Sequence, residues 1–235
     1  GLLYAGAAVG VSHLVQSTRA GAEFGFQLLA IVILVNVIKY PIFELGPRYA
    51  AATGRTLLDG YHQIGAWAVW IYFLLSALTM FIVMGAISIV TAGLFAQLTG
   101  IPLDAPIVAM LLLILSVLIL GFGHYSLLDR SMKVIMIVLT ISTLLALIAS
   151  FFTPIEKQAE FETTFNFLES AHILFLVALI GWMPAPIDIS IWHSVWVVSK
   201  NKEQGHTIPM SQALLDFKVG YWGTMILAVC FLTLG

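Results

Sequence analysis

A carboxylate and an imidazole lie inside one of the most apolar parts of the chain, at Asp188 and His193 in GWMPAPIDISIWHS (residues 181–194). Ionisable groups inside an apolar span are costly, and they usually bind ions or carry protons. Pro184 and Pro186 stand just before the carboxylate, and a proline inside a helix removes a backbone donor and clashes with the preceding turn. We therefore expect the helix to break here, with a new half-helix starting at Pro186 and Asp188 in its first turn.

Both side chains have a structural and a functional interpretation. Asp188 either stabilises the start of the half-helix through the helix dipole or binds a cation at the break. His193 follows five residues later and is rotated away from Asp188 on a regular helix, so a joint metal site of these two is not expected. A packed, hydrogen-bonded histidine is the simpler interpretation of His193, and a proton relay is the alternative.

A second interruption is expected in GVSHLVQSTRAGAEFG, at residues 10–25. Ser12, His13 and Gln16 form a polar cluster there, and Ser12 and Gln16 share one face if the helix persists. His13 is either a metal ligand or proton carrier, or the partner of a carbonyl that the break leaves free. Unwound backbone at membrane depth is tolerated where it lines a cavity or is buried in protein, so both stretches are candidate binding sites.

The elements that position these residues are helices of an all-α polytopic membrane protein. The chain has 235 residues, of which 60% are hydrophobic and 9% charged, whereas soluble domains are about one-quarter charged. The long apolar runs predict about seven membrane segments in a single transmembrane domain over residues 1–235. These segments lie near residues 2–17, 24–47, 63–96, 105–123, 131–152, 167–198 and 212–234.

Basic residues are concentrated in every second loop, apart from the first turn, which is mixed and carries Arg19 and Glu23. The loops near residues 48–62, 124–133 and 199–211 carry arginine or lysine, whereas residues 97–104 carry none. The positive-inside rule places the basic loops in the cytoplasm, and the N-terminal end of the first segment with them. We expect an integral, multi-pass protein of a bacterial-type plasma membrane, and a chain that is an internal portion of a longer one.

Enzymatic signatures are missing from the sequence, which has no H-E-x-x-H, CxxC, phosphate loop or nucleophile elbow. Cys230 is the one cysteine, so an internal disulfide and a thiolate metal site are excluded. There is no basic footprint for nucleic acid. We expect no enzyme, no cofactor and no nucleic-acid partner; the expected partners are the lipid bilayer and a transported ion or small solute.

Lys39 is a further charged residue within apolar sequence, followed by Pro41 and Glu44. It either interacts with Glu44 across the proline or extends to the membrane interface.

The two interrupted segments are the first and the sixth, so they cross the membrane in opposite directions. Two broken helices in corresponding positions indicate an inverted-repeat transporter with its binding site at the breaks. We expect a first repeat over about 1–152 and an incomplete second repeat over about 165–235.

The order of these features resembles the natural resistance-associated macrophage protein (Nramp) family of divalent-metal transporters, over nearly the whole chain. The most specific parts of this resemblance are AGAEFGFQLL (20–29), PRYAAATGRTLLDG (47–60), HYSLLDRSMKVIMIVL (124–139), ALIGWMPAPIDISIWHS (178–194) and ALLDFKVGYWG (213–223). The resemblance implies a five-plus-five inverted repeat with helices one and six broken at the substrate site. On that frame the chain covers helices one to seven.

The chain departs from this family at its metal-binding motifs. The Asp-Pro-Gly-Asn motif of the first helix falls on Gly10-Val11-Ser12-His13, so Gly10 stands at the aspartate position and His13 at the asparagine position. With one residue inserted before His193, the Met-Pro-His motif of helix six falls on Ala185-Pro186-Ile187, which removes the soft methionine sulfur at Ala185; the alternative is a shifted alignment in which Met183 restores a sulfur. The acids that typical members carry in helix three have no counterpart here. The remaining candidate site consists of Gly10, Ser12, His13, Gln16, Ala185, Pro186 and Asp188, with His13 and Asp188 as the candidate metal ligands.

Three functions are compatible with this sequence. The first is an Nramp-like secondary transporter that moves a divalent metal ion by rocking one helix bundle against another. The second keeps the fold and carries a small organic solute or a monovalent ion. The third is a membrane scaffold or sensor that transports nothing.

Overall fold

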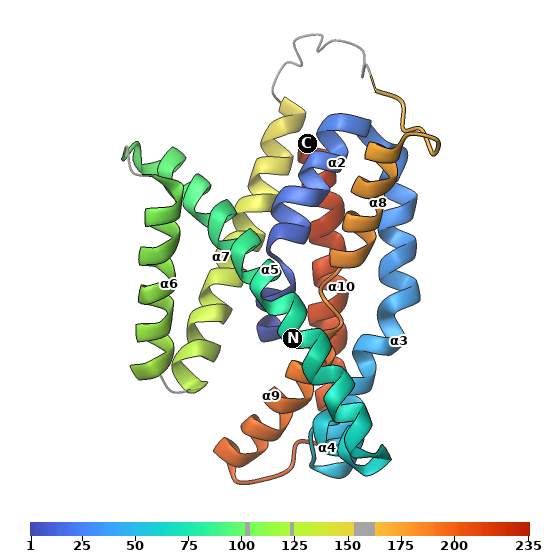
Figure 1. The fold of residues 1–235 in the computed structure, drawn as a ribbon, viewed down its shortest axis with the longest axis vertical. Coiled ribbons are helices and arrows are strands. Elements are labelled where there is room, and N and C mark those ends of the chain that lie inside the picture. The colour runs from blue at the N-terminus through green and yellow to red at the C-terminus, as the bar shows by residue number, and fades with distance from the viewer. Residues whose placement is uncertain (102–103, 123–124, 153–162) are drawn as a thin grey trace. The chain divides into compact units, whose positions relative to one another are not determined.

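The computed structural model of the protein describes residues 1–101, 104–122, 125–152 and 163–235, and within these ranges it contains helices and no strands (Figure 1). The helices are α1 (Leu2–Ala8), the π-helical segment η1 (Val11–Ser17), α2 (Thr18–Phe24), the short 3-10 helix η2 (Gly25–Leu28), α3 (Leu29–Thr53), α4 (Leu57–Ile64), α5 (Ala66–Thr99), α6 (Ala105–Phe122), α7 (Tyr125–Phe152), α8 (Ser170–Trp182), α9 (Asp188–Gln204) and α10 (Met210–Leu234).

Long apolar helices account for much of this structure. Four helical runs of the described residues are long and apolar enough to cross a membrane: Val11–Thr53, Ala66–Thr99, Asp129–Phe152 and Met210–Leu234. Two shorter apolar helices, Ala105–Ile119 and Ser170–Trp182, accompany them. Each of the predicted apolar segments contains at least one helix, and the prediction of an all-α polytopic membrane protein is confirmed.

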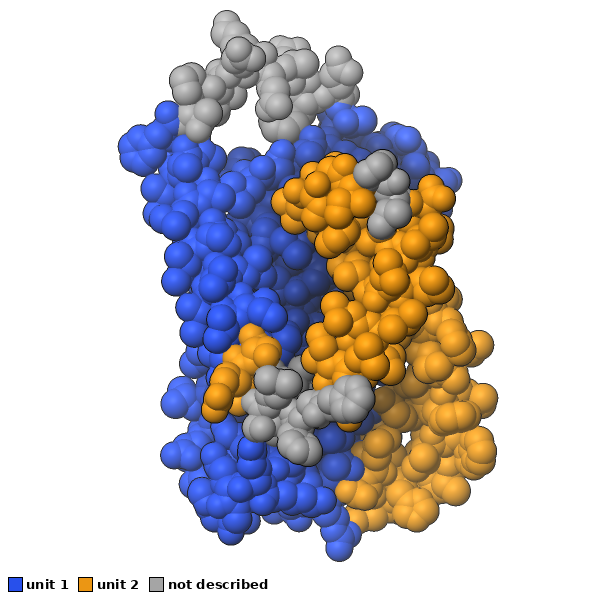
Figure 2. All heavy atoms as spheres, turned by 90° about the vertical axis from the view of Figure 1, so that its left-hand side faces the viewer, with its two compact units in different colours: residues 1–57, 132–235 blue, residues 58–131 orange. Residues whose placement is uncertain are grey.

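The helices are grouped into two compact units, which Figure 2 shows in different colours. The smaller unit covers residues 58–131, where α5 packs against α6 through Ala92, Val108 and Ala109. The larger unit covers residues 1–57 and 132–235 and contains both predicted interruptions. The limits of the two repeats, about 1–152 and 165–235, stay a prediction.

In the larger unit, α10 packs against α1, η1, α2 and α3, and α3 also packs against α9. The approach of α3 to α9 is close enough to require glycine. A Cβ atom added at Gly46 of α3 would lie 2.0 Å from the carbonyl oxygen of Ser190 in α9. The Ser190 hydroxyl donates to the carbonyl oxygen of Ile42 at 2.8 Å, so the same contact is also hydrogen-bonded. These contacts fix α9, and with it the end of the second interruption, against α3.

Candidate functional site at two broken helices

The first helix is interrupted where the sequence predicts it. α1 ends at Ala8, Val9 is extended, and Gly10 has φ −148° and ψ −132°, outside any helical region. The chain resumes at Val11 as the π-helical segment η1, which the sequence does not predict. In this segment the Ser17 hydroxyl donates to the carbonyl oxygen of Ser12, five residues earlier, at 3.3 Å.

The second interruption separates α8 from α9. α8 ends at Trp182, Met183 is extended, and the peptide bond from Met183 to Pro184 is cis. α9 begins at Asp188, with Asp188 in its first turn as predicted. The prediction that Pro186 opens the half-helix is wrong, because the first turn is formed by hydrogen bonds to the carbonyls of Pro186 and Ile187 and the helix starts after them.

The two interruptions contact each other. The Ser12 hydroxyl lies 3.4 Å from the carbonyl oxygen of Pro184. On either side of this contact, α1 touches α9 and η1 touches α8. The N-terminal half of one broken helix therefore lies against the C-terminal half of the other, and the two run in opposite directions, as the course of α1 to α2 and of α8 to α9 shows in Figure 1. Ser12 and His13 are brought next to the second break in this way.

His13 is fully buried, and both of its ring nitrogens have partners. Nε2 lies 3.1 Å from the carbonyl oxygen of Thr224 in α10, and Nδ1 lies 2.7 Å from the Ser12 hydroxyl. Because a carbonyl oxygen only accepts, Nε2 donates, and in the neutral ring Nδ1 then accepts the Ser12 proton. Ser12 also lies 3.0 Å from the Ala8 carbonyl oxygen. This geometry favours the second alternative for His13, the partner of a backbone carbonyl. The carbonyl belongs to Thr224 in α10 and not, as expected, to the break itself.

We expect the substitution His13→Leu to lower the free energy of unfolding by about 1–3 kcal/mol, because it leaves the buried Thr224 carbonyl without this donor. His206→Leu is the matched control, since His206 is exposed and its one hydrogen-bond contact is to the nearby Gln204 carbonyl. Thermal or denaturant unfolding of the two variants in detergent measures the difference. Equal stability of both variants would contradict the role assigned to the His13 hydrogen bonds.

Asp188 and Gln16 have side-chain oxygen atoms without a hydrogen-bond partner among the described residues. The Asp188 side chain is partly exposed, and its carboxylate has no hydrogen bond or ion pair within the described part of the chain. The Gln16 Oε1 atom is buried and also lacks a partner there. A buried oxygen without a donor is uncommon in a protein and indicates a place where a cation or a water molecule completes the site. Among the described residues, no hydrogen bond or ion pair joins Asp188 to His13, so the structure does not bring these two candidate ligands together.

Ala185 is fully buried in an apolar cluster. The cluster consists of Tyr4, Ala8, Phe43, Ala185, Ile189, Phe217 and Tyr221. The position where the resemblance implies a methionine sulfur is thus packed by hydrocarbon and aromatic groups.

His193 is packed as predicted, but it is not hydrogen-bonded at Nδ1. Its ring stacks on Tyr4 at 5.6 Å between centroids and also contacts Phe217 and Trp196. The Nδ1 atom is buried without a partner among the described residues. The expectation of a hydrogen-bonded histidine is therefore wrong at this atom, because aromatic rings surround it.

Lys39 lies at the second break, a position that its sequence context does not predict. Its Nζ atom donates to the carbonyl oxygens of Ile180 at 2.6 Å, Gly181 at 3.3 Å and Met183 at 2.9 Å. The predicted interaction of Lys39 with Glu44 is therefore wrong, since Glu44 instead lies 3.3 Å from Arg48, whereas the extension of Lys39 to the membrane interface stays a prediction. The available signal was Pro184, which cannot donate to the Ile180 carbonyl and so leaves it in need of another donor.

The predicted metal site is not assembled as a cluster of ligand side chains. Within the described residues, no group of three or more histidine, cysteine, aspartate or glutamate side chains could hold a metal ion. Oxygen atoms are nevertheless present, at the carbonyls of both breaks, at Gln16 and at Asp188.

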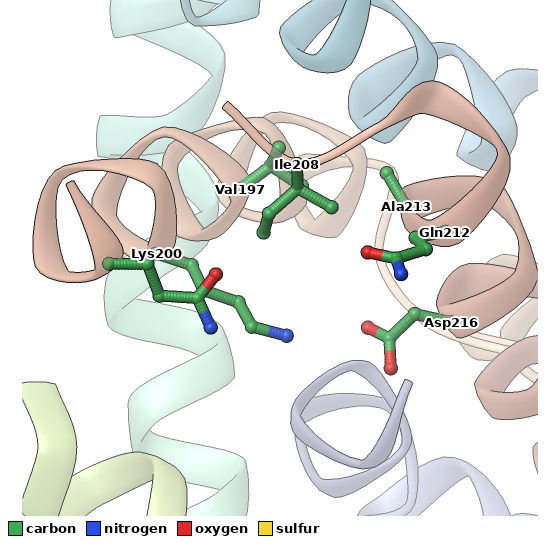
Figure 3. A pocket seen from close by; sticks show the side chains of 7 residues that line it. Val197, Lys200, Ile208, Gln212, Ala213 and Asp216 are labelled. Carbon is green, nitrogen blue, oxygen red and sulfur yellow. The ribbon is translucent and has the colours of Figure 1, made fainter. Parts of the chain in front are cut away.

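A pocket lies away from the two breaks, between the C-terminal half of α9 and the first turns of α10 (Figure 3). It is lined by Val197, Lys200, Gln204, Ile208, Gln212, Ala213 and Asp216. None of the candidate site residues lines it, so it is separate from the site at the breaks.

Comparison with known proteins identifies one family and two relatives of this chain. Residues 1–234 match the family model described as natural resistance-associated macrophage protein-like. The chain is 40% identical over 237 residues to an uncharacterized protein of Pasteurella multocida (strain Pm70), covering 100% of this chain and 54% of that protein. It is 35% identical over 108 residues to the divalent metal cation transporter MntH of Brucella suis biovar 1 (strain 1330), which covers 44% of this chain and 23% of MntH.

The chain thus spans about half of the length of the Pasteurella relative. No solved structure matches it. The match over residues 1–234 shows that this chain, whose long apolar helices place it in a membrane, belongs to the Nramp family.

Proposed function

We propose that the chain forms the substrate-handling part of a secondary transporter of the Nramp type, which moves a divalent metal ion by alternating access. The observation that carries this proposal is the contact between the two breaks, where the Ser12 hydroxyl lies 3.4 Å from the Pro184 carbonyl oxygen. Broken helices that meet in this way expose backbone groups at the middle of a membrane span, which is where such transporters bind their cargo. The MntH relative is named a divalent metal cation transporter, and this supports the choice of cargo.

In this proposal the candidate residues have different roles. Asp188 supplies the negative charge that a divalent ion requires, and Gln16 supplies a neutral oxygen. Gly10, Ala185 and Pro186 contribute through their backbone at the breaks. His13 holds the first break in position through the Thr224 carbonyl, and Ser12 donates to His13 Nδ1 and lies beside the Pro184 carbonyl. We further propose that the N-terminal end is on the cytoplasmic side of a bacterial-type plasma membrane, as the basic loops indicate.

A second candidate keeps the fold and changes the cargo to a small organic solute or a monovalent ion. It is favoured by one observation: the described residues bring no three metal-binding side chains together. A single carboxylate leaves much of the charge of a divalent ion uncompensated. It is sufficient for a singly charged cargo, and a neutral cargo needs no compensating charge.

Transport measurements separate these candidates. The full-length protein that contains this chain is reconstituted in proteoliposomes, and uptake of manganese, iron, cobalt and magnesium is measured together with binding calorimetry. Saturable uptake of at least one of these ions is expected. If no uptake occurs and calorimetry shows no binding, the metal-ion proposal fails. A scaffold or sensor would additionally show neither ligand-dependent thermal stabilisation nor alternate inward-open and outward-open states.

Asp188→Asn tests the site assignment with little change in shape. We expect uptake at low ion concentration to fall by about tenfold or more, equivalent to roughly 1.4 kcal/mol of lost binding, because the carboxylate charge is removed. Stability should hardly change, since the carboxylate has no partner in the described structure. Glu203→Gln is the matched control: it lies on the same helix, is exposed, and should leave uptake unaltered. Uptake that survives Asp188→Ala combined with His13→Ala would refute the assignment.

A further inference from the structure

The Lys39 ammonium lies among three backbone carbonyl oxygens at the end of α8. The distances from Nζ are 2.6 Å to Ile180, 2.9 Å to Met183 and 3.3 Å to Gly181. An ammonium has three protons, so this arrangement uses the full donor capacity of the group. Lys39 belongs to α3, which makes the contact a bridge between α3 and the unwound turn of the second break.

These carbonyls are available because α8 stops abruptly. A helix leaves its last four carbonyl groups without helical partners. The Met183 N–H donates to the Leu179 carbonyl at 3.0 Å and so satisfies one of them. The next one, that of Ile180, would be bonded by residue 184, which is a proline and has no N–H. The negative end of the α8 dipole points to the same place and favours a positive charge.

A group of backbone carbonyls at the end of a half-helix is also what binds a dehydrated monovalent cation in membrane proteins. Carbonyl oxygens replace the water shell of such ions, and unwound helices in transporters bind coupling cations in this manner. The three carbonyl oxygens around Lys39 form a group of the same kind, which binds the lysine ammonium in place of a free ion. The ammonium carries one positive charge and is held by the chain, so it needs no ion from solution.

We propose that the carbonyl group at the end of α8 is a monovalent-cation site that Lys39 fills as a tethered cation. The second break is then stabilised without sodium or potassium from solution, and removal of the lysine side chain opens the site to such an ion. This inference concerns the break alone and holds whatever cargo the protein carries. Its test is a binding measurement that requires no transport.

The test compares the thermal unfolding of the full-length protein in sodium, potassium and lithium chloride with that in choline chloride at the same ionic strength. The unmodified protein is expected to unfold at the same temperature in all four salts. Lys39→Ala should unfold roughly 5–10 °C lower in choline chloride, because charge-assisted hydrogen bonds are lost. At least one alkali cation should restore part of this shift in a saturable manner, since a ligand that binds only the folded state stabilises it.

Two further variants make the result specific. Lys218→Ala removes an exposed lysine from α10 and should show neither the shift nor the ion dependence. Lys39→Arg keeps a positive charge at the site and should remain insensitive to the alkali cation. If Lys39→Ala is recovered folded in potassium or sodium chloride and not in choline chloride, the proposal is supported by that result alone.

The contrary outcomes are equally defined. Unfolding temperatures of Lys39→Ala that are equal in choline and in every alkali salt would show that Lys39 is a helix cap and that the carbonyls bind no free ion. Failure to recover folded Lys39→Ala in any of the salts would count against the proposal in the same way. Alkali cations that stabilise the unmodified protein and Lys39→Ala to the same extent would place their binding site elsewhere.

Discussion

Gly46→Ala is expected to destabilise the protein by about 3 kcal/mol, although alanine is the better helix former. The added Cβ atom would lie 2.0 Å from the Ser190 carbonyl oxygen and 2.9 Å from its carbonyl carbon. These atoms belong to the backbone of α9, so no side-chain rotation relieves the contact and the two helices must move apart. Such a movement also strains the hydrogen bond from the Ser190 hydroxyl to Ile42 and shifts the start of α9.

Gly85→Ala provides the matched control within the same sequence. Gly85 lies inside α5, where a Cβ atom would meet nothing within 4 Å. The same substitution there should be neutral or stabilising by about 0.5–1 kcal/mol, because alanine restricts the unfolded chain more than glycine does. Denaturant or thermal unfolding in detergent measures both variants. If the two variants are equally stable, α3 and α9 do not pack as closely at Gly46 as the structure indicates.

Local sequence signals were sufficient to predict the two interruptions. Pro184 and Pro186 cannot continue a helix, and Gly10 opens a stretch rich in polar groups, so both breaks follow from backbone chemistry alone. Asp188 in the first turn of α9 follows for the same reason. The apolar runs likewise predicted the helical membrane class, since every predicted segment contains a helix.

The partners of the site residues could not be predicted in this way, because they come from distant parts of the chain. His13 is bonded to the carbonyl of Thr224, 211 positions later, and no property of either residue singles out the other. Lys39 reaches Ile180 across 141 positions. The proline predicted a carbonyl in need of a donor, but several donors in the sequence could have filled that role. Only the packing of α3 against α8 decides which one does.

Gly10→Asp is expected to increase the affinity for a divalent cation at the two breaks by about 10–100-fold, equivalent to roughly 1.4–2.8 kcal/mol. Gly10 stands where the resemblance to the Nramp family implies a metal-binding aspartate. A Cβ atom at this position would meet nothing within 4 Å, so the new side chain has room. The carboxylate would add a negative charge at the first break, in addition to that of Asp188 at the second, and hard divalent ions bind carboxylate oxygens strongly.

Titration calorimetry with manganese and magnesium on the full-length protein measures this effect. Gly10→Asn is the control, because it has nearly the same shape and backbone cost without the charge. Ala185→Met, the other motif position, is expected to behave differently, since Ala185 is fully buried and a larger side chain would displace its aromatic neighbours at a cost of about 1–3 kcal/mol. If Gly10→Asp binds manganese and magnesium no more tightly than Gly10→Asn does, a carboxylate at the first break does not interact with the ion. The breaks would then serve a cargo other than a divalent metal, because a carboxylate beside any divalent-ion site must raise its affinity.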